Sequence, residues 1–274
     1  MLLATALALA AAVIHASWNL LAKASADRFL ALWGQFAVAA VLSAIVLVAT
    51  RTLPAAAWWR AILTGAVHVP YIAGLAHAYD RGDFAVAYPV ARGSGAVLAA
   101  IGGVLVLDDR LGAWTVVAIA VVAGGMALLA GGAHVTQLLA ALLVGAAIGF
   151  YTVNDSRAMR TYDDWTYAFA VFLTIGLTTT GYGLVIGRGR SMVATMRADG
   201  RRYALTGTLV AASYFLVLLA VRRAPVGYVA ALRESSVLMA AFLGARYLSE
   251  ANARRRTVAA AVILAGLVLL IATA

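Results

Sequence analysis

The chain has 274 residues, of which 64% are hydrophobic and only 12% are charged, and its formal net charge is +10. Soluble domains are usually about 45–50% apolar and about 25% charged, so this composition excludes an ordinary cytosolic enzyme, a nucleic-acid binder and a disordered tail. The sequence has no cysteine, which excludes disulfides, iron–sulfur clusters, thiolate zinc sites and cysteine nucleophiles.

A helix that crosses a bilayer needs roughly 20 mostly apolar residues. Division of the chain where charged residues, glycine and proline cluster gives about ten such segments with short loops between them. The sequence therefore predicts an all-α membrane protein with ten transmembrane helices. The expected helices cover residues 2–21, 30–49, 58–79, 84–106, 113–130, 137–157, 165–186, 203–221, 226–247 and 257–273, and the longest expected loop covers 187–202.

The first apolar segment ends in polar side chains. It lacks a basic start, so we interpret it as the first membrane span and not as a cleaved leader. His15, Trp18 and Asn19 are spaced i, i+3, i+4, which places them on one helix face. That face indicates either the wall of a transport cavity or a helix end anchored at the membrane interface, and both interpretations stay open.

The third span combines a proline with histidines and tyrosines. Pro70 lies between His68 and Tyr71, and the span ends with His77 and Tyr79. A proline inside a helix frees a backbone carbonyl, which protein or water must satisfy within the membrane. These side chains indicate either a polar cavity wall or ordinary interfacial histidines and tyrosines.

Two arginines are expected inside the membrane, Arg92 in the fourth span and Arg233 in the ninth. At about 1.5 Å per residue they lie roughly 10–12 Å deep, where an arginine costs about 2.5–3.5 kcal/mol and needs a partner. Glu234 reaches Arg92 if the two spans meet. Either one arginine receives a substrate carboxylate in bidentate geometry, or all three form a structural Arg–Glu–Arg lock, which is the interpretation we favour.

The same arginines mark an internal repeat. A shift of 141 residues lays Arg92 on Arg233, and a shift of 143 lays Tyr71 on Tyr214. Each half then holds five spans, and because five is odd, the second half must enter the membrane the opposite way up, as in many transporters. The two predicted repeats are residues 1–133 and 134–274.

The sixth span matches the first in spacing. Tyr151, Asn154 and Asp155 repeat the i, i+3, i+4 pattern of the first span after a shift of 136 residues. The pattern again indicates a cavity wall or a helix end. Asp155 lies close to the expected end of its helix and is either hydrated there or buried with Arg92, Arg233 and Glu234, a set whose charges cancel.

Three stretches resemble the drug/metabolite transporter (DMT) superfamily in its ten-helix EamA-like branch: HASWNLLAK, YPVARGSGAVLAAIGGVLVLDDRLGAW and APVGYVAALRESSVLMAAFLGARYLSE. The resemblance covers the whole chain and implies the DMT/EamA transporter fold. The sequence is similar to amino-acid exporters of the YddG type. This similarity implies export of small metabolites, most of all amino acids, across the bacterial inner membrane by alternating access. In those exporters aromatic and histidine side chains line the cavity, and the resemblance implies this role for Tyr71, His77, Tyr79 and Tyr88.

The fifth and tenth spans contain almost no polar side chains past their first turns. We expect them to face lipid, with their glycines packing against the bundle or, alternatively, in a dimer; a monomer is the expected state. The other spans should surround the pathway. The candidate substrate-binding residues are His15, Trp18, Asn19, Tyr71, His77, Tyr79, Tyr88, Arg92, Tyr151, Asn154, Trp165, Tyr214, Arg233 and Glu234.

The motifs that are missing limit the chemistry. There is no P-loop for ATP, no HExxH or GxSxG motif, and no acidic residue in the first span of the kind that four-helix drug exporters use. We therefore expect a secondary transporter of a small molecule, with no enzymatic activity and no cofactor. The alternatives are other cargo, such as a nucleotide sugar or a drug cation, and a channel or scramblase.

The basic residues do not settle the orientation. With an even number of spans both termini lie on one side of the membrane, whose loops hold seven lysines and arginines, against twelve in the opposite loops. The positive-inside rule then places the termini outside, whereas the resemblance implies termini inside, and the orientation stays open.

Overall fold

The structure is a computed structural model that describes residues 1–23, 27–80, 84–129, 135–237, 239 and 253–273. The described residues form ten α-helices and one short 3-10 helix, and no strand is found among them. This confirms the predicted all-α architecture. The helices are α1 (Leu2–Lys23), α2 (Arg28–Thr50), η1 (Ala55–Ala57), α3 (Trp58–Asp80), α4 (Phe84–Leu107), α5 (Ala113–Leu129), α6 (Val135–Tyr162), α7 (Tyr167–Val185), α8 (Gly189–Val221), α9 (Val226–Arg233) and α11 (Ala253–Ala272).

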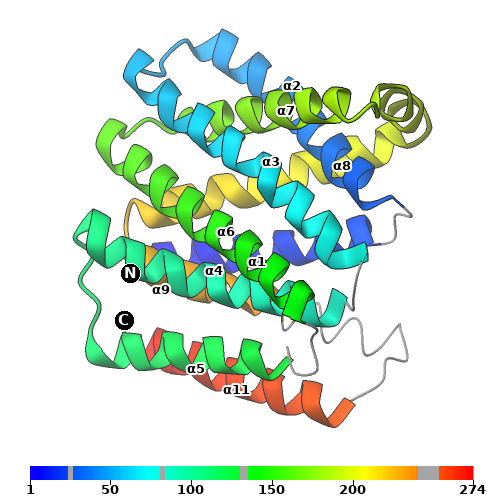
Figure 1. Cartoon of the computed structure of the whole chain (residues 1–274). Helices are drawn as coiled ribbons and strands as arrows, with labels where there is room; N and C mark the ends of the chain where they lie inside the picture. The colour runs from blue at the N-terminus through cyan, green and yellow to red at the C-terminus, as the bar shows by residue number, and fades with distance from the viewer. Residues whose placement is uncertain (24–26, 81–83, 130–134, 238, 240–252, 274) are drawn as a thin grey trace.

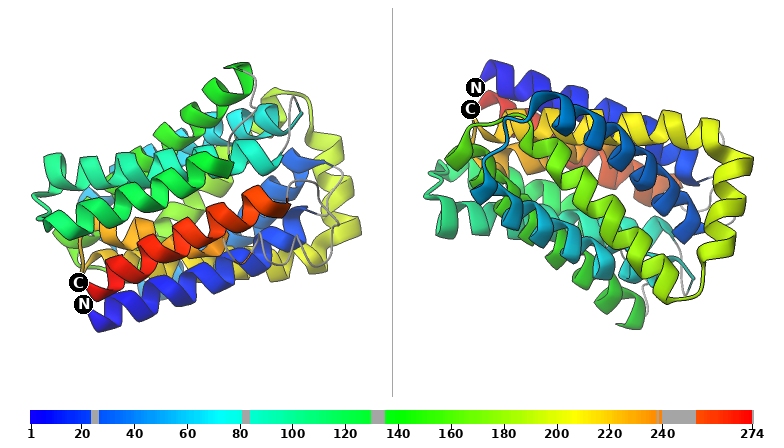
Figure 2. Two further views of the ribbon diagram at one scale, coloured as in Figure 1. Left: turned by 90° about the horizontal axis from the view of Figure 1, so that it is seen from below. Right: turned by 90° about the horizontal axis from the view of Figure 1, so that it is seen from above.

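Five of these helices are long and apolar enough to cross a membrane by length and composition, namely α2, the Pro89–Leu107 part of α4, the Leu138–Tyr162 part of α6, α7 and α8. Shorter apolar helices cover Leu2–Trp18, Ala113–Leu128 and Thr257–Ala272. The helices run roughly side by side, and both termini lie at the same end of the bundle (Figure 2). That placement agrees with an even number of membrane crossings.

The expected loop 187–202 is wrong, because most of it is helical. Gly187, in the turn after α7, adopts a positive φ of 76°. Helix α8 begins at Gly189 and runs to Val221 with a kink at one non-helical residue, Asp199. The search for apolar runs did not identify this stretch, because it is rich in arginine. Arginine is polar, but it favours helices about as well as leucine does. Tyr203, which follows the expected loop, is buried inside α8.

The ninth span also differs from its prediction. Helix α9 is regular only from Val226 to Arg233, and Glu234 forms a turn before residues 235–237 return to helix. Most of the remainder of the expected span lies outside the described residues. The turn places a helix C-terminus, with its partial negative charge, at Arg233.

Helix pairs that join the first and second halves of the chain recur with the two halves exchanged. Helix α1 packs on α8 as α6 packs on α3, and α2 packs on α8 as α7 packs on α3. The pairs α2–α7, α4–α9 and α5–α11 join corresponding helices of the two halves. Prolines Pro70 and Pro89 lie inside α3 and α4 without ending them.

Helices α5 and α11 form a separate layer along one edge of the bundle (Figure 1). A Cβ added to Gly124 would meet none of the described residues within 4 Å, whereas Gly125 and Gly266 pack against each other's helix: a Cβ on Gly125 would lie 2.6 Å from Ile263, and one on Gly266 would lie 2.8 Å from Val122. Those distances are too short for real side chains, so the two glycines permit the close approach. They serve packing within the chain, as the sequence favoured.

Candidate functional site

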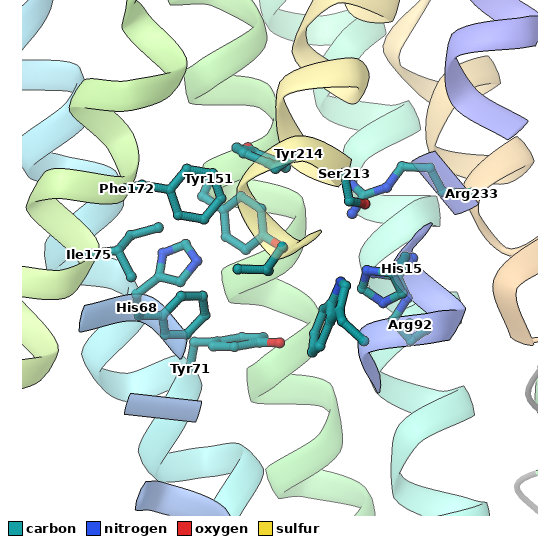
Figure 3. A pocket seen from close by; sticks show the side chains of 13 residues that line it. His15, His68, Tyr71, Arg92, Tyr151, Phe172, Ile175, Ser213, Tyr214 and Arg233 are labelled. Carbon is teal, nitrogen blue, oxygen red and sulfur yellow. The ribbon is translucent and has the colours of Figure 1, made fainter. Parts of the chain in front are cut away.

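The centre of the bundle holds a cavity of about 50 Å³ that eight helices surround. A space of that size holds a few water molecules, so it must widen before a metabolite enters. Figure 3 shows an aromatic group on one side and His15, Arg92, Ser213 and Arg233 on the other. The lining residues are His15, Trp18, Phe36, His68, Tyr71, Arg92, Tyr151, Phe172, Ile175, Val210, Ser213, Tyr214 and Arg233.

Seven of the candidate residues meet at this cavity, although they come from both halves of the sequence: His15, Trp18, Tyr71, Arg92, Tyr151, Tyr214 and Arg233. Asn154, Trp165 and Glu234 lie elsewhere. The side chains of Asn19, His77, Tyr79 and Tyr88 lie outside the described part of the structure.

The sequence reasoning did not select six lining residues: Phe36, His68, Phe172, Ile175, Val210 and Ser213. His68 had a detectable signal, because it lies three residues before Tyr71 on the same helix face. The apolar residues had none, since nothing in their local sequence separates a cavity wall from ordinary packing.

Tyr151 is at the centre of the aromatic side. Its ring centroid lies 4.7 Å from that of His68, 6.0 Å from that of Tyr214 and 6.3 Å from that of Tyr71. The Nδ1 atom of His68 lies 2.8 Å from the carbonyl oxygen of Thr64. Because a carbonyl only accepts hydrogen bonds, His68 donates through Nδ1. This bond fixes the orientation of the imidazole ring and therefore the position of Nε2.

Arg92 and Glu234 form a buried, two-point ion pair. The Nη2 atom of Arg92 donates to Oε1 of Glu234 at 2.7 Å, and Nε donates to Oε2 at 3.3 Å. The exposed fractions of the two residues are 5% and 2%. Glu234 therefore reaches Arg92 across the α4–α9 contact and does not line the cavity, which corrects its assignment as a substrate-binding residue.

Arg233 has no such partner. It is 7% exposed, and its guanidinium lies 5.8 Å from the ring centroid of Tyr214, within the range of a cation–π contact. Among the described residues it makes no ion pair and no hydrogen bond. Adjacent positions on a helix point about 100° apart, so Glu234 turns toward Arg92 while Arg233 turns toward the cavity. The three residues do not form the Arg–Glu–Arg lock that the sequence favoured.

Trp18 contributes a second polar group without a partner. Its indole Nε1 is buried and forms no hydrogen bond within the described structure, and its ring packs edge-on to His15 with centroids 4.7 Å apart. Buried polar groups are normally hydrogen-bonded. A donor left unpaired at a cavity wall is therefore available to a ligand.

Asp155 is the centre of a second polar cluster, beside the cavity. It is fully buried, with an exposed fraction of 0%, and α6 continues beyond it to Tyr162, so Asp155 is not a hydrated helix end. Its Oδ1 accepts hydrogen bonds from Thr64 at 2.5 Å and Tyr167 at 2.8 Å, and its Oδ2 accepts one from Tyr214 at 2.6 Å. Tyr214 thus links the carboxylate to the cavity wall.

Asn154 belongs to the Asp155 cluster and does not line the cavity. Its Nδ2 donates to Thr64 Oγ1 at 2.9 Å, to the Arg60 carbonyl at 3.0 Å and to Asp155 Oδ1 at 3.2 Å. Its Oδ1 accepts from Arg60 Nη1 at 3.1 Å. The side chain therefore joins α6 to α3, which corrects its predicted role.

Trp165 is also away from the cavity. It is 43% exposed and packs edge-on to Phe169 and Phe215, with centroids 5.7 and 6.3 Å apart. Its position before the first turn of α7 suits an interfacial tryptophan. The prediction that it contacts substrate is not supported by this placement.

A polar contact ties the two halves together near the chain termini. Arg160 of α6 donates to Asp109 Oδ1 at 2.6 Å and to the Val221 carbonyl at 2.8 Å. The other oxygen of Asp109 accepts a hydrogen bond from the Val226 backbone N–H at 2.6 Å. One carboxylate therefore joins the end of α4 to α6 and to the start of α9.

The sequence and the fold are both similar to those of known proteins. The sequence profile of the EamA-like transporter family matches residues 135–272. A solved structure described only as "Crystal structure of protein" aligns with a TM-score of 0.74 at 16% sequence identity, over 99% of this chain and 98% of that chain, which is a likeness of fold. No curated protein matches the sequence.

Proposed function

We propose that this chain, which belongs to the EamA-like transporter family, is a secondary transporter that exports amino acids across the bacterial inner membrane by alternating access. Family membership makes it a multi-pass membrane transporter of small substrates. The amino-acid cargo rests on one observation, the unpaired guanidinium of Arg233 at the cavity wall.

The charges around the cavity favour a substrate carboxylate. Arg92 and Glu234 neutralise each other in a two-point ion pair, and among the described residues no acidic side chain pairs with Arg233. A buried arginine is costly in the membrane, and a carboxylate matches its fork of N–H donors in bidentate geometry. Substrate binding would thus supply the partner that the protein does not.

The rest of the cavity suits the other parts of an amino acid. The aromatic faces of Tyr71 and Tyr151 offer cation–π contacts to an ammonium group, and Asp155 adds a negative charge behind Tyr214. Phe36, Phe172 and Ile175 offer an apolar surface to a side chain. A drug cation would be repelled by Arg233, and the two phosphates of a nucleotide sugar would need more than one unpaired cation.

The proposed movement is a rocking of residues 1–133 against residues 134–274 as inverted repeats. The exchange of packing partners supports this: α1 on α8 corresponds to α6 on α3. The cavity is lined from both halves, so relative motion would open it on alternate sides. The Arg160–Asp109 contact joins the halves at the end of the bundle that holds the termini, and it would have to break when that end opens.

Counterflow in proteoliposomes tests the proposal. Vesicles loaded with one unlabelled amino acid should accelerate entry of its labelled form in a saturable manner, whereas nucleotide sugars and quaternary ammonium ions should not. The Arg233→Gln variant should exchange roughly tenfold to a hundredfold less efficiently, and Arg223→Gln, which removes an exposed charge from the α8–α9 loop, should exchange like the wild type. Non-saturable flux would indicate a channel, and exchange driven by a nucleotide sugar or a drug cation would contradict the amino-acid assignment.

A further inference from the structure

Helix α6 packs against both α3 and α4 (Figure 1), and a second hollow, on the outer surface of the bundle, is lined by residues of these three helices. Its volume of about 530 Å³ is within the usual range for ligand sites, about 300–1,000 Å³. Most of its wall is apolar and faces outward: Leu98, Val106 and Phe150 are 41%, 46% and 49% exposed. In a membrane protein such a surface is in contact with lipid chains.

One end of this groove carries two arginines. Arg60 lies in the first turn of α3 and Arg157 near the end of α6, and both line the groove. These positions are at the end of the bundle that holds the chain termini, so they lie toward a membrane surface. Trp59, which also lines the groove, is 51% exposed and has the position of an interfacial anchor.

Both guanidiniums have unused hydrogen-bond donors. Arg157 is exposed and makes no ion pair or hydrogen bond with the described residues. Arg60 gives Nη1 to Asn154 and lies 4.2 Å from the ring of Trp59, but its buried Nε has no partner in the described structure. An anion at this point would satisfy donors that the protein leaves open, and the N-terminus of α3 would add a favourable dipole.

We propose that this groove is a binding site for one anionic phospholipid. The phosphate contacts Arg60 and Arg157 at the headgroup level, beside Trp59, and an acyl chain lies along Leu63, Leu98 and Phe150. The shape and the charge select this occupant together, because the site joins an apolar channel in the lipid region to a cationic end at the interface. Basic pockets between transmembrane helices recognise anionic headgroups by the same combination. The site is separate from the central cavity, so the inference does not depend on the cargo.

A chain of hydrogen bonds connects the groove to the cavity. Arg60 binds Asn154, Asn154 binds Asp155, and Asp155 accepts from Tyr214 at the cavity wall. Replacement of Arg60 would therefore disturb the buried cluster as well as the groove. Arg157 makes no such contact and is the better position for a test.

Native mass spectrometry of the purified full-length protein in a neutral detergent tests the headgroup. Phosphatidylglycerol and phosphatidylcholine with identical acyl chains are titrated separately. The wild type should retain phosphatidylglycerol more tightly, and Arg157→Gln should weaken that binding about fivefold, since one basic residue near a membrane surface contributes about that factor. Arg223→Gln removes an exposed charge at the same end of the bundle and should have no effect. Equal retention of the two lipids, or equal effects of the two arginine variants, would overturn the proposal.

A second pair of variants tests the acyl chain. Ala146 is exposed and lines the groove, so Ala146→Trp should fill it and weaken binding of phosphatidylglycerol at least fivefold. Leu139→Trp adds the same ring at a lipid-facing position of α6 outside the groove and should leave binding unchanged. Wild-type affinity in Ala146→Trp would show that the chain lies elsewhere and would overturn the proposed site.

Discussion

Arg92 and Arg233 occupy corresponding positions of the two sequence halves, and both are almost completely buried. Arg92 has its counter-charge within the protein, in Glu234, whereas Arg233 lies over the ring of Tyr214 and makes no ion pair with the described residues. The difference arises at one turn. Helix α4 continues through Arg92 to Leu107, but α9 ends at Arg233, and Glu234 is turned toward the other arginine. Two arginines that the predicted repeat aligns therefore differ in surroundings: one is paired inside the protein, and the other is the proposed substrate site.

The largest expected effect is on the paired side of this comparison. Arg92→Gln leaves Glu234 as an uncompensated buried charge, and breaking such a pair typically costs about 3–5 kcal/mol of stability. The melting temperature of the variant in detergent should fall sharply. Arg92→Gln combined with Glu234→Gln should recover a large part of the loss, because the neutral pair leaves no buried charge. Native-like melting of the single variant would refute the structural role.

On the open side, Arg233→Gln should impair transport and preserve the fold. Hydrogen bonds to charged groups contribute about 1.5–3 kcal/mol, so we expect kcat/KM for amino-acid exchange to fall roughly tenfold to a hundredfold. The melting temperature should stay at the wild-type value or rise. Arg233→Lys keeps the charge but loses the bidentate fork and should give an intermediate rate. Severe destabilisation by Arg233→Gln would show that this arginine, like Arg92, has a structural role.

Tyr214 lies between the two regions and should show a mixed, smaller effect. Tyr214→Phe removes the hydroxyl that donates to Asp155 but keeps the ring beneath Arg233. Asp155 retains its other donors, so the loss of stability should be about 1–2 kcal/mol, with transport reduced severalfold. Thermal melting and counterflow on the same preparation measure both. A variant with wild-type melting would show that this bond contributes nothing to the buried cluster.

Trp165 should show the smallest effect of all. Because it packs near the surface with Phe169 and Phe215, Trp165→Ala should leave the KM for exchange within twofold of wild type and lower stability by about 1 kcal/mol. A large rise in KM would indicate that Trp165 contributes to substrate binding and would contradict this prediction.

The sequence predicted the elements of the fold because long apolar runs must be helical in a membrane. It did not predict the polar first part of α8, since the length of apolar runs carries no information about helices outside the bilayer. The burial of Asp155 could not be decided for a related reason: α6 continues through Arg157 to Tyr162, so a residue near the expected end of its span lies well inside the helix.

The predicted repeat aligned the two arginines, and the sequence favoured a lock in which Glu234 pairs with both, whereas in the structure it pairs with Arg92. The choice depends on the turn after Arg233 and on the α4–α9 contact, which are properties of the folded chain. The same holds for the cavity wall. Charged and aromatic residues stood out by type and spacing, whereas Phe36, Phe172 and Ile175 could be recognised only once the helices were in place.

The most direct test compares an amino acid with its carboxamide, which keeps the side chain and the ammonium group and removes only the negative charge. Both are measured as competitors of counterflow in proteoliposomes containing wild type or Arg233→Gln, with the best amino acid of the initial screen. Pairing of the carboxylate with Arg233 predicts that the wild type prefers the acid by at least tenfold and that Arg233→Gln loses the preference. If the variant discriminates between acid and amide as well as the wild type does, Arg233 is not the carboxylate site.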